Sequence, residues 1–204
     1  MKLYKKWVVI SLSGCIVSTY GCTPNPESVK DKNYETSKYI EKLMNESKQI
    51  APQYAKVKEK LEGNIELSDG DDFIVETYVT GLFYQSFPKY KKEVEAIFPK
   101  YYKVSANSAV NLISMPLSID PDYRGDSIDD FEALTSKETY EWIMAKADSV
   151  ESEISSIDKT SWDYKEVMYT VAECKRALYY RLGDVEKEKK YKALAKKYER
   201  FLLN

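Results

Sequence analysis

The sequence predicts an all-α protein. Only seven of its 204 residues are glycine. Apolar residues recur along most of the chain at the three-to-four-residue spacing of amphipathic helices. Removal of an N-terminal segment, described below, leaves about 180 residues, which suits one domain. We expect a single helical domain over residues 34–204, with roughly six to eight helices in consecutive hairpins, forming either an α-α superhelix or an irregular helical bundle.

The first helix is expected over residues 34–50. Its inward face is apolar and consists of Tyr39, Ile40, Leu43 and Ile50. Because proline lacks a backbone N–H and crowds the preceding turn, Pro52 is expected to end this helix and to begin a short new one. Gly63 marks the end of that second piece.

The next helix follows the turn at Asp69-Gly70-Asp71, and we expect Asp71 or Asp72 to cap it through a side-chain oxygen. Its buried face is broad and consists of Ile74, Val75, Tyr78, Val79, Leu82 and Phe83. Pro88 separates it from a further helical pattern made by Tyr90, Val94, Ile97 and Tyr101. Pro99 lies inside that pattern and is expected to kink or break the helix.

Another helix is expected over residues 105–114, ending before Pro116. Residues 117–128 have no helical pattern and are predicted to form a loop. A helix over residues 137–157 follows, with Ser136 as its N-cap.

The last two helices have the clearest patterns. Residues 163–182 carry Val167, Val171, Cys174 and Leu178 on one face, and residues 185–203 carry a second apolar face. Gly183-Asp184 forms the short link, which predicts an antiparallel helical hairpin.

This hairpin resembles a tetratricopeptide repeat. Tyr179-Tyr180-Arg181-Leu182-Gly183-Asp184 is similar to the end of a repeat's first helix and its turn, and Ala195 stands where the second helix of a repeat has a small residue. Arg176 and Glu188 depart from the small residues of the family. Since no second copy follows at the period of about 34 residues, a degenerate repeat and an unrelated hairpin both remain open.

The N-terminus is expected to be a targeting segment rather than part of the fold. Lys2, Lys5 and Lys6 precede an apolar stretch that begins at Trp7, and small residues then lead to a cysteine. This segment resembles the signal peptide of bacterial lipoproteins, which implies removal of residues 1–21, lipidation of Cys22 and anchoring to a membrane. Residues 22–33 are then the lipidated cysteine and a flexible tether.

Two cysteines compete for the lipid. Leu12-Ser13-Gly14-Cys15 matches the family's cleavage box, but it leaves a short apolar region. Thr19-Tyr20-Gly21-Cys22 matches the box less well, but it has a longer apolar region and a polar sequence after it. Cys22 is favoured and Cys15 is the alternative. The resemblance places the protein in the cell envelope, and in the outer membrane, facing the periplasm or the surface, if the source has two membranes.

Composition excludes several function classes. Without residues 1–21 the net charge falls from −2 to −5, because three lysines and no acids are lost. Such a chain lacks the clustered cations that phosphate contacts need, so we expect no nucleic-acid partner. There is no histidine, which removes the usual general base and the commonest metal ligand. Cys174 lies on an apolar stripe and is expected in the core. We therefore predict a protein that is not an enzyme and has no cofactor.

One acidic segment has the opening spacing of a calcium loop. Asp120 and Asp122 stand at its first and third positions, but Arg124 stands at the fifth and Phe131 at the twelfth. Calcium needs oxygen ligands at both of these places. We expect a surface turn and no metal site.

Eighteen tyrosines are many for a chain of this length, and tyrosine is enriched in recognition interfaces. The candidate partner-binding residues are those beside the predicted loop and those at the end of the 163–182 helix: Tyr101, Tyr102, Tyr123, Tyr179 and Tyr180. The sequence thus predicts a membrane-anchored, non-catalytic helical adaptor or assembly factor with a protein partner in the envelope. The alternative is an envelope lipoprotein that binds a small ligand such as a glycan or a peptidoglycan fragment.

Overall fold

The all-α prediction is confirmed. The computed structural model describes residues 26–119, 131–154, 159 and 162–202, and within these ranges it contains eight helices and no strand. The helices are α1 (Pro26–Glu62), α2 (Asp69–Gln85), α3 (Phe87–Val104), α4 (Ala106–Ser118), α5 (Phe131–Leu134), α6 (Lys137–Ile154), α7 (Trp162–Arg181) and α8 (Val185–Leu202). None of the helices in the described part of the chain is long and apolar enough to cross a bilayer.

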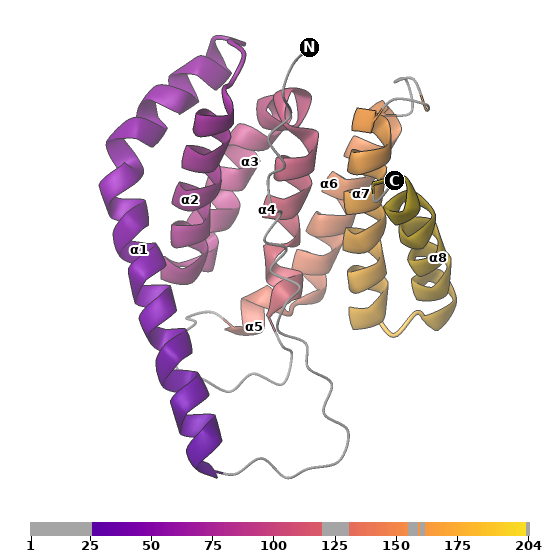
Figure 1. Cartoon of the computed structure of the whole chain (residues 1–204), viewed down its shortest axis with the longest axis horizontal. Helices are drawn as coiled ribbons and strands as arrows, with labels where there is room; N and C mark the ends of the chain where they lie inside the picture. Colours follow the sequence, from indigo (N-terminus) through magenta and orange to yellow (C-terminus); the bar gives the residue numbers. More distant parts are fainter. Residues whose placement is uncertain (1–25, 120–130, 155–158, 160–161, 203–204) are drawn as a thin grey trace.

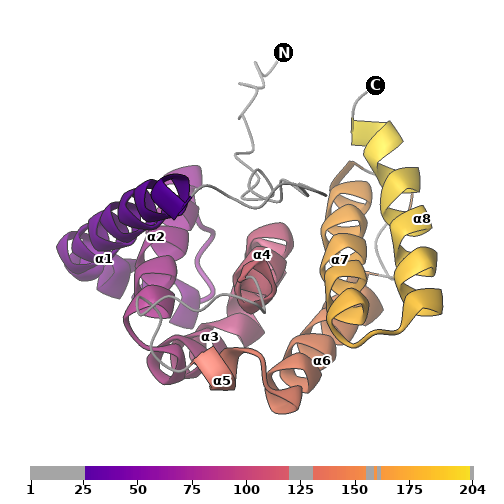
Figure 2. The ribbon, with the colours of Figure 1, turned by 90° about the horizontal axis from the view of Figure 1, so that it is seen from below.

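The helices form a curved array in which consecutive long helices run antiparallel (Figure 1). In Figure 2, α1 and α2 lie at one end of the arc and α7 and α8 at the other. The helices α2, α4 and α7 form one row, and α3 and α6 lie in a second row on the outer side. Helix α4 packs against α2, α3, α6 and α7 and is therefore the centre of the array.

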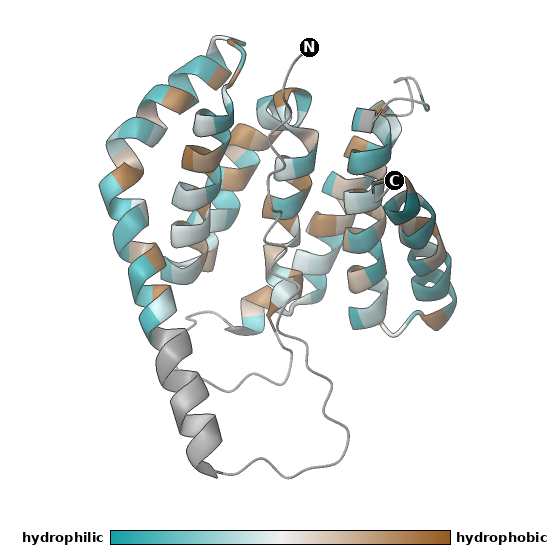
Figure 3. Ribbon diagram, viewed as in Figure 1, coloured by the Kyte–Doolittle hydropathy of each residue, from teal (hydrophilic) through white to brown (hydrophobic). Residues whose placement is uncertain are grey.

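The core follows from the apolar faces of these helices. Figure 3 shows brown apolar residues distributed along the helices that pack together and a mostly hydrophilic α8 at the edge of the array. Val79, Ile113 and Leu178 from three different helices are completely buried. Tyr90 is buried as well, and its hydroxyl donates a hydrogen bond to the carbonyl of Leu112, so α3 and α4 are joined by a polar contact inside the core.

The structure corrects two expectations about the first helix. Pro52 does not end it, because α1 continues from Pro26 to Glu62 with Pro52 inside. The buried residues Tyr54, Val57 and Leu61 follow the proline, so packing offsets the lost hydrogen bond. Residues 26–33, expected as part of a flexible tether, are helical. A proline in the first helical turn loses no hydrogen bond, and no glycine or further proline occurs before position 52.

The start of α2 also differs from the prediction. Ser68, rather than Asp71 or Asp72, is the N-cap, and the Asp71 N–H donates to Ser68 Oγ at 3.3 Å. In return the Ser68 N–H donates to Asp71 Oδ2 at 2.8 Å, which completes a capping box. Lys60 of α1 donates to Asp71 Oδ1 at 2.8 Å. The bonds from Lys60 and from Ser68 lower the pKa of Asp71 to about 2.

Helices α1 and α2 approach each other closely at Gly81. A Cβ atom at this position would lie 2.0 Å from Ser47 Cβ and 2.4 Å from Ser47 Oγ. The Ser47 hydroxyl donates to the backbone carbonyl of Tyr78 at 3.0 Å. Gly81 is therefore needed for the contact between the two helices, rather than for backbone flexibility.

Two further prolines lie inside helices, although Pro99 was expected to kink or break its helix and Pro116 to follow one. Pro99 is within α3 and Pro116 is within α4, which continues to Ser118. The predicted loop therefore begins later than residue 117, and residues 120–130 lie outside the described part. Arg181 of α7 donates to the carbonyls of Leu117 and Ile119 at 2.9 and 2.5 Å, which supplies partners at the C-terminal end of α4.

The C-terminal half agrees closely with the sequence prediction. The Thr139 N–H donates to Ser136 Oγ at 3.2 Å, so Ser136 caps α6 as expected. Gly183 has a φ of 70° in the turn between α7 and α8, a conformation that glycine adopts without strain. The side chain of Cys174 is 4 % exposed and lies in the core.

Candidate functional site

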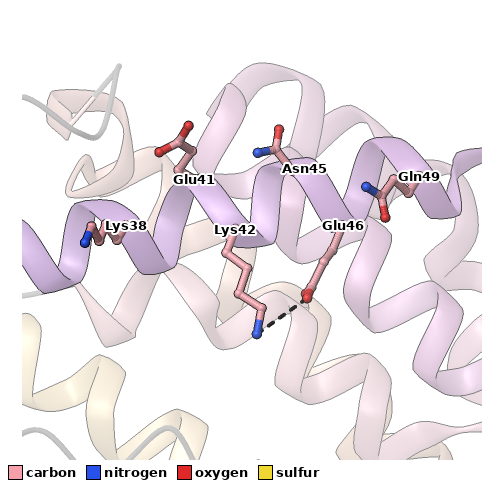
Figure 4. Close-up of a pocket in the computed structure, with 6 residues that line it drawn as sticks. All are labelled: Lys38, Glu41, Lys42, Asn45, Glu46 and Gln49. Carbon is pink, nitrogen blue, oxygen red and sulfur yellow. Dashed lines mark ion pairs between the residues drawn. The ribbon is translucent and has the colours of Figure 1, made fainter.

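Two hollows on the surface are candidates for a binding site. The first, about 520 Å³ in volume, lies along the outer face of α1 and is lined by Lys38, Glu41, Lys42, Asn45, Glu46 and Gln49 (Figure 4). Lys42 and Glu46 form an ion pair at 3.7 Å. The lining contains charged and amide groups from one helix and no aromatic side chain, which is the composition of a solvated helix face.

The second hollow combines apolar and charged groups from two helices. It is about 350 Å³ in volume and is lined by Phe98, Pro99, Tyr102, Lys103, Ala145, Lys146 and Ser149. We call it the α3/α6 hollow. Helix α3 packs on α2 and α4, and α6 packs on α4 and α7. Because both α3 and α6 rest on α4, their outer faces border the hollow.

Helical spacing explains why these side chains reach the hollow. Phe98 and Tyr102 are four residues apart and therefore share a face of α3, whereas Tyr101 is rotated into the core. On α6, Ala147 and Val150 are buried, and the exposed Ala145 and Ser149 lie on a different side of the helix. Each helix thus turns one stripe to the core and another to the hollow.

Aromatic rings form the base of the α3/α6 hollow. The rings of Phe98 and Tyr102 stack with centroids 5.4 Å apart. Lys146 Nζ lies 5.1 Å from the centre of the Phe98 ring, and Lys103 Nζ lies 6.0 Å from the centre of the Tyr102 ring. Neither lysine forms an ion pair with any residue that the structure describes.

One carboxylate borders this surface. The Tyr102 hydroxyl donates a hydrogen bond to Glu153 of α6. Burial and the Glu153 carboxylate together raise the pKa of Tyr102 to about 12, so the phenol stays protonated at neutral pH. The lining of the hollow contains two cations and no carboxylate.

The structure does not gather the five candidate tyrosines into one patch. Tyr101 is 0 % exposed, so its side chain offers a partner no surface. Tyr102 lies in the α3/α6 hollow. Tyr179 and Tyr180 lie at the end of α7, where Tyr179 is half-buried and Tyr180 is 65 % exposed. Tyr123 lies outside the described residues.

Tyr180 belongs to a small exposed apolar area at the turn between α7 and α8. Leu182 and Val185 are 48 % and 54 % exposed in the same segment. Tyr179 instead stacks on Tyr191 of α8, with ring centroids 5.5 Å apart. Tyr179 therefore stabilises the hairpin, and Tyr180 is the tyrosine of the pair that a partner can reach.

A polar cluster between α2, α3 and α4 was missed by the sequence reasoning. Asp72 accepts a hydrogen bond from Ser105 at 2.9 Å, but its other oxygen and the Tyr101 hydroxyl have no partner at hydrogen-bonding geometry among the described residues. Burial raises the pKa of both Asp72 and Glu76. Ser105 and Tyr101 partly oppose this rise at Asp72, and Ser108 partly opposes it at Glu76. The only signal for it in the sequence was two acids four residues apart in an apolar helix.

Other expected sites have the following positions. Burial raises the pKa of the Cys174 thiol to about 12, so it is an inert core thiol. The described residues contain no group of three or more histidine, cysteine, aspartate and glutamate side chains able to hold a metal ion. Cys15, Cys22 and the acidic segment from Asp120 to Asp126 lie outside the described residues.

No protein-family model, no curated protein and no solved structure matches this chain. The function is therefore argued from the chain's own residues.

Proposed function

We propose that this chain is a membrane-anchored cell-envelope lipoprotein that acts as a non-catalytic helical adaptor or assembly factor and binds another protein. Lipid on Cys22 would fix the N-terminus to the membrane, and the helical array would present the binding surface. Anchoring raises the local concentration of the body near partners in the same membrane, so that modest contacts suffice.

The N-terminal sequence supports the anchor. Lys2, Lys5 and Lys6, the apolar stretch from Trp7 and the cysteines at 15 and 22 together resemble a lipoprotein signal. Attachment by two or more acyl chains gives stable membrane binding, whereas one chain binds only marginally.

The observation that carries the binding role is the α3/α6 hollow. Aromatic residues are enriched at the buried centres of protein interfaces. Phe98 and Tyr102 provide the rings, and Lys103 and Lys146 provide cations without ion pairs among the described residues. A surface with this composition can bind a partner, and binding needs no reactive group.

The test is crosslinking and affinity purification from the native envelope, with the lipidated protein compared with a Cys22→Ala form. The expected result is one specific protein recovered with the anchored form and depleted with Cys22→Ala. Recovery of the same proteins in equal amount with both forms would show that partner binding does not depend on the anchor. Recovery of a glycan or lipid and of no protein would remove the adaptor role.

The alternative function is binding of a small ligand such as a glycan or peptidoglycan fragment. The aromatic base of the α3/α6 hollow, within its volume of about 350 Å³, is the observation in its favour. Sugar rings need open aromatic faces, however, and here Phe98 is only 3 % exposed and Lys146 lies over its ring. The adaptor function is therefore the better supported of the two.

A further inference from the structure

We infer that the α3/α6 hollow binds an acidic segment of the partner protein, in which carboxylates flank an apolar side chain. This inference rests on the proposed adaptor function and adds the chemistry of the partner. It follows from the charge of the hollow, from the nature of its base and from its size.

The charge of the hollow is complementary to that of an acidic segment. Lys103 and Lys146 are the only charged residues that line the hollow. The chain as a whole has more acids than bases, with 33 Asp and Glu against 31 Lys and Arg. Some described lysines are neutralised within the protein, as Lys58 is by Glu93 at 2.6 Å, whereas no acid lines the hollow beside Lys103 and Lys146. Two lysines without a described counter-charge on one small surface therefore favour carboxylates on the partner.

The hollow also exposes apolar surface between its two lysines. Pro99 and Ala145 are exposed and contribute carbon surface, and the Lys146 ammonium lies over the buried Phe98 ring beneath them. An apolar side chain of the partner gains free energy by covering this surface. The ammonium groups next to the rings then meet carboxylates on either side of that apolar residue.

The size of the hollow and a neighbouring carboxylate limit what it can bind. A volume of about 350 Å³ is at the lower end of the range for small-molecule pockets, so the hollow accommodates a few side chains and not a whole helix. Glu153, which accepts the hydrogen bond from Tyr102, borders the hollow and repels an acid placed directly against it. The partner's acids are therefore directed to the lysines.

The experiment is selection from a random-peptide phage library on the immobilised, lipidated full chain in detergent. The enriched peptides are then synthesised and their dissociation constants measured by fluorescence anisotropy. We expect enriched peptides to carry Asp or Glu beside an apolar residue, and replacement of their acids by Asn or Gln to weaken binding. The variant Lys103→Glu with Lys146→Glu should bind the acidic peptide about tenfold more weakly or worse.

The matched control is Lys192→Glu with Lys196→Glu, which makes the same change of charge on exposed positions of α8. It should bind the peptide as the wild type does. A peptide with lysines in place of its acids should bind the Lys103→Glu, Lys146→Glu variant better than the wild type. Circular dichroism confirms that both variants keep the helical fold.

Several results would overturn the inference. These are enrichment of neutral or basic peptides, enrichment of none, or equal loss of binding in the control variant. Loss of flotation with vesicles of phosphatidylcholine and phosphatidylglycerol in the Lys103→Glu, Lys146→Glu variant would also contradict it. That result would mean that the two lysines face a membrane and not a protein. If the envelope partner is captured equally by the variant and the wild type, the hollow is not its site and the adaptor role stands. If the wild type captures no partner, the adaptor role itself fails.

Discussion

The Lys175 ammonium on α7 lies 2.5 Å from Asp148 Oδ1 on α6, although the Lys175 side chain is only 2 % exposed. It also pairs with Glu151 and lies 5.5 Å from the centre of the Tyr191 ring on α8. Burial alone would lower the pKa of Lys175, but its bonds to Asp148 and Glu151 raise it above the usual value. One buried cation therefore joins the last three helices.

Removing the two carboxylates should cost more stability than removing the Lys175 ammonium. Replacing Asp148 and Glu151 together by alanine leaves a buried ammonium without counter-charge and should lower the free energy of unfolding by about 3 kcal/mol. Lys175→Met should cost less than about 1 kcal/mol, because Asp148 and Glu151 are 57 % and 34 % exposed and can be hydrated. Urea unfolding at neutral pH measures both, and equal losses would contradict this account.

Asp71 should make stability sensitive to acid. Its pKa is lowered from 3.8 to about 2 in the folded state, so the folded state prefers the ionised form. The stabilisation is complete above the unfolded pKa and is lost as the pH falls from about 4 towards 2. At neutral pH, Asp71→Asn should lower the free energy of unfolding by about 1–2 kcal/mol.

The measurement is urea unfolding of the wild type and Asp71→Asn at several pH values. The difference between them should disappear near pH 2. Ser68→Ala removes the other half of the capping box and serves as a control, since its cost should persist in acid to a greater extent. A constant difference for Asp71→Asn at all pH values would count against the lowered pKa.

Asp72 and Glu76 should have the opposite dependence. Burial raises the pKa of each carboxyl, so ionisation at neutral pH costs stability in the folded state. The contribution of each group is most favourable below its ordinary pKa and is lost as the pH rises through the raised value. Glu76→Gln should therefore raise the melting temperature by a few degrees at pH 7, and the gain should shrink in acid. A gain that grows in acid would refute the assignment.

The contact between Gly81 and Ser47 predicts a pair of compensating mutations. Gly81→Ala should lower the free energy of unfolding by about 2–3 kcal/mol, because its Cβ would overlap Ser47. Ser47→Gly creates room for that atom. The double variant should therefore be more stable than Gly81→Ala alone, as a double-mutant cycle from urea unfolding would show. If the two losses simply add, the steric account is wrong.

The helices were predictable where the apolar pattern ends at a helix-breaking residue. Gly183 separates two periodic segments, and the predicted hairpin is present within a residue or two of its expected bounds. Pro52 was expected to end a helix and Pro116 to follow one, but both lie inside helices, and Pro99 does not break α3. A proline inside a helix costs about 3 kcal/mol in isolation, but packing can offset that cost. Pro116 is buried, and the exposed Pro52 and Pro99 lie within two residues of the buried Tyr54 and Phe98. Packing of that kind is not visible in a local pattern.

The binding surface was predictable only in part. The sequence selected Tyr102 because it flanks the predicted loop, whereas the structure places it in the α3/α6 hollow. Its neighbour Tyr101 was selected on equal grounds and is fully buried. Two adjacent tyrosines of a helix point in different directions, and the apolar pattern that includes Val94 and Ile97 already placed Tyr101 on the inward face. The pairing with Lys146 joins helices far apart in sequence, so no local spacing indicates it.

The length of α1 changes how an anchored form of the protein would be positioned. Its 37 residues correspond to about 55 Å of helix, whereas the 17 residues of α2 correspond to about 25 Å. Only three residues stand between Cys22 and Pro26, and they can extend over no more than about 14 Å. With lipid on Cys22, α1 would be a rigid stalk that sets the height of the α3/α6 hollow above the bilayer. The partner's acidic segment would then have to be presented at that height, which makes distance from the membrane an element of recognition.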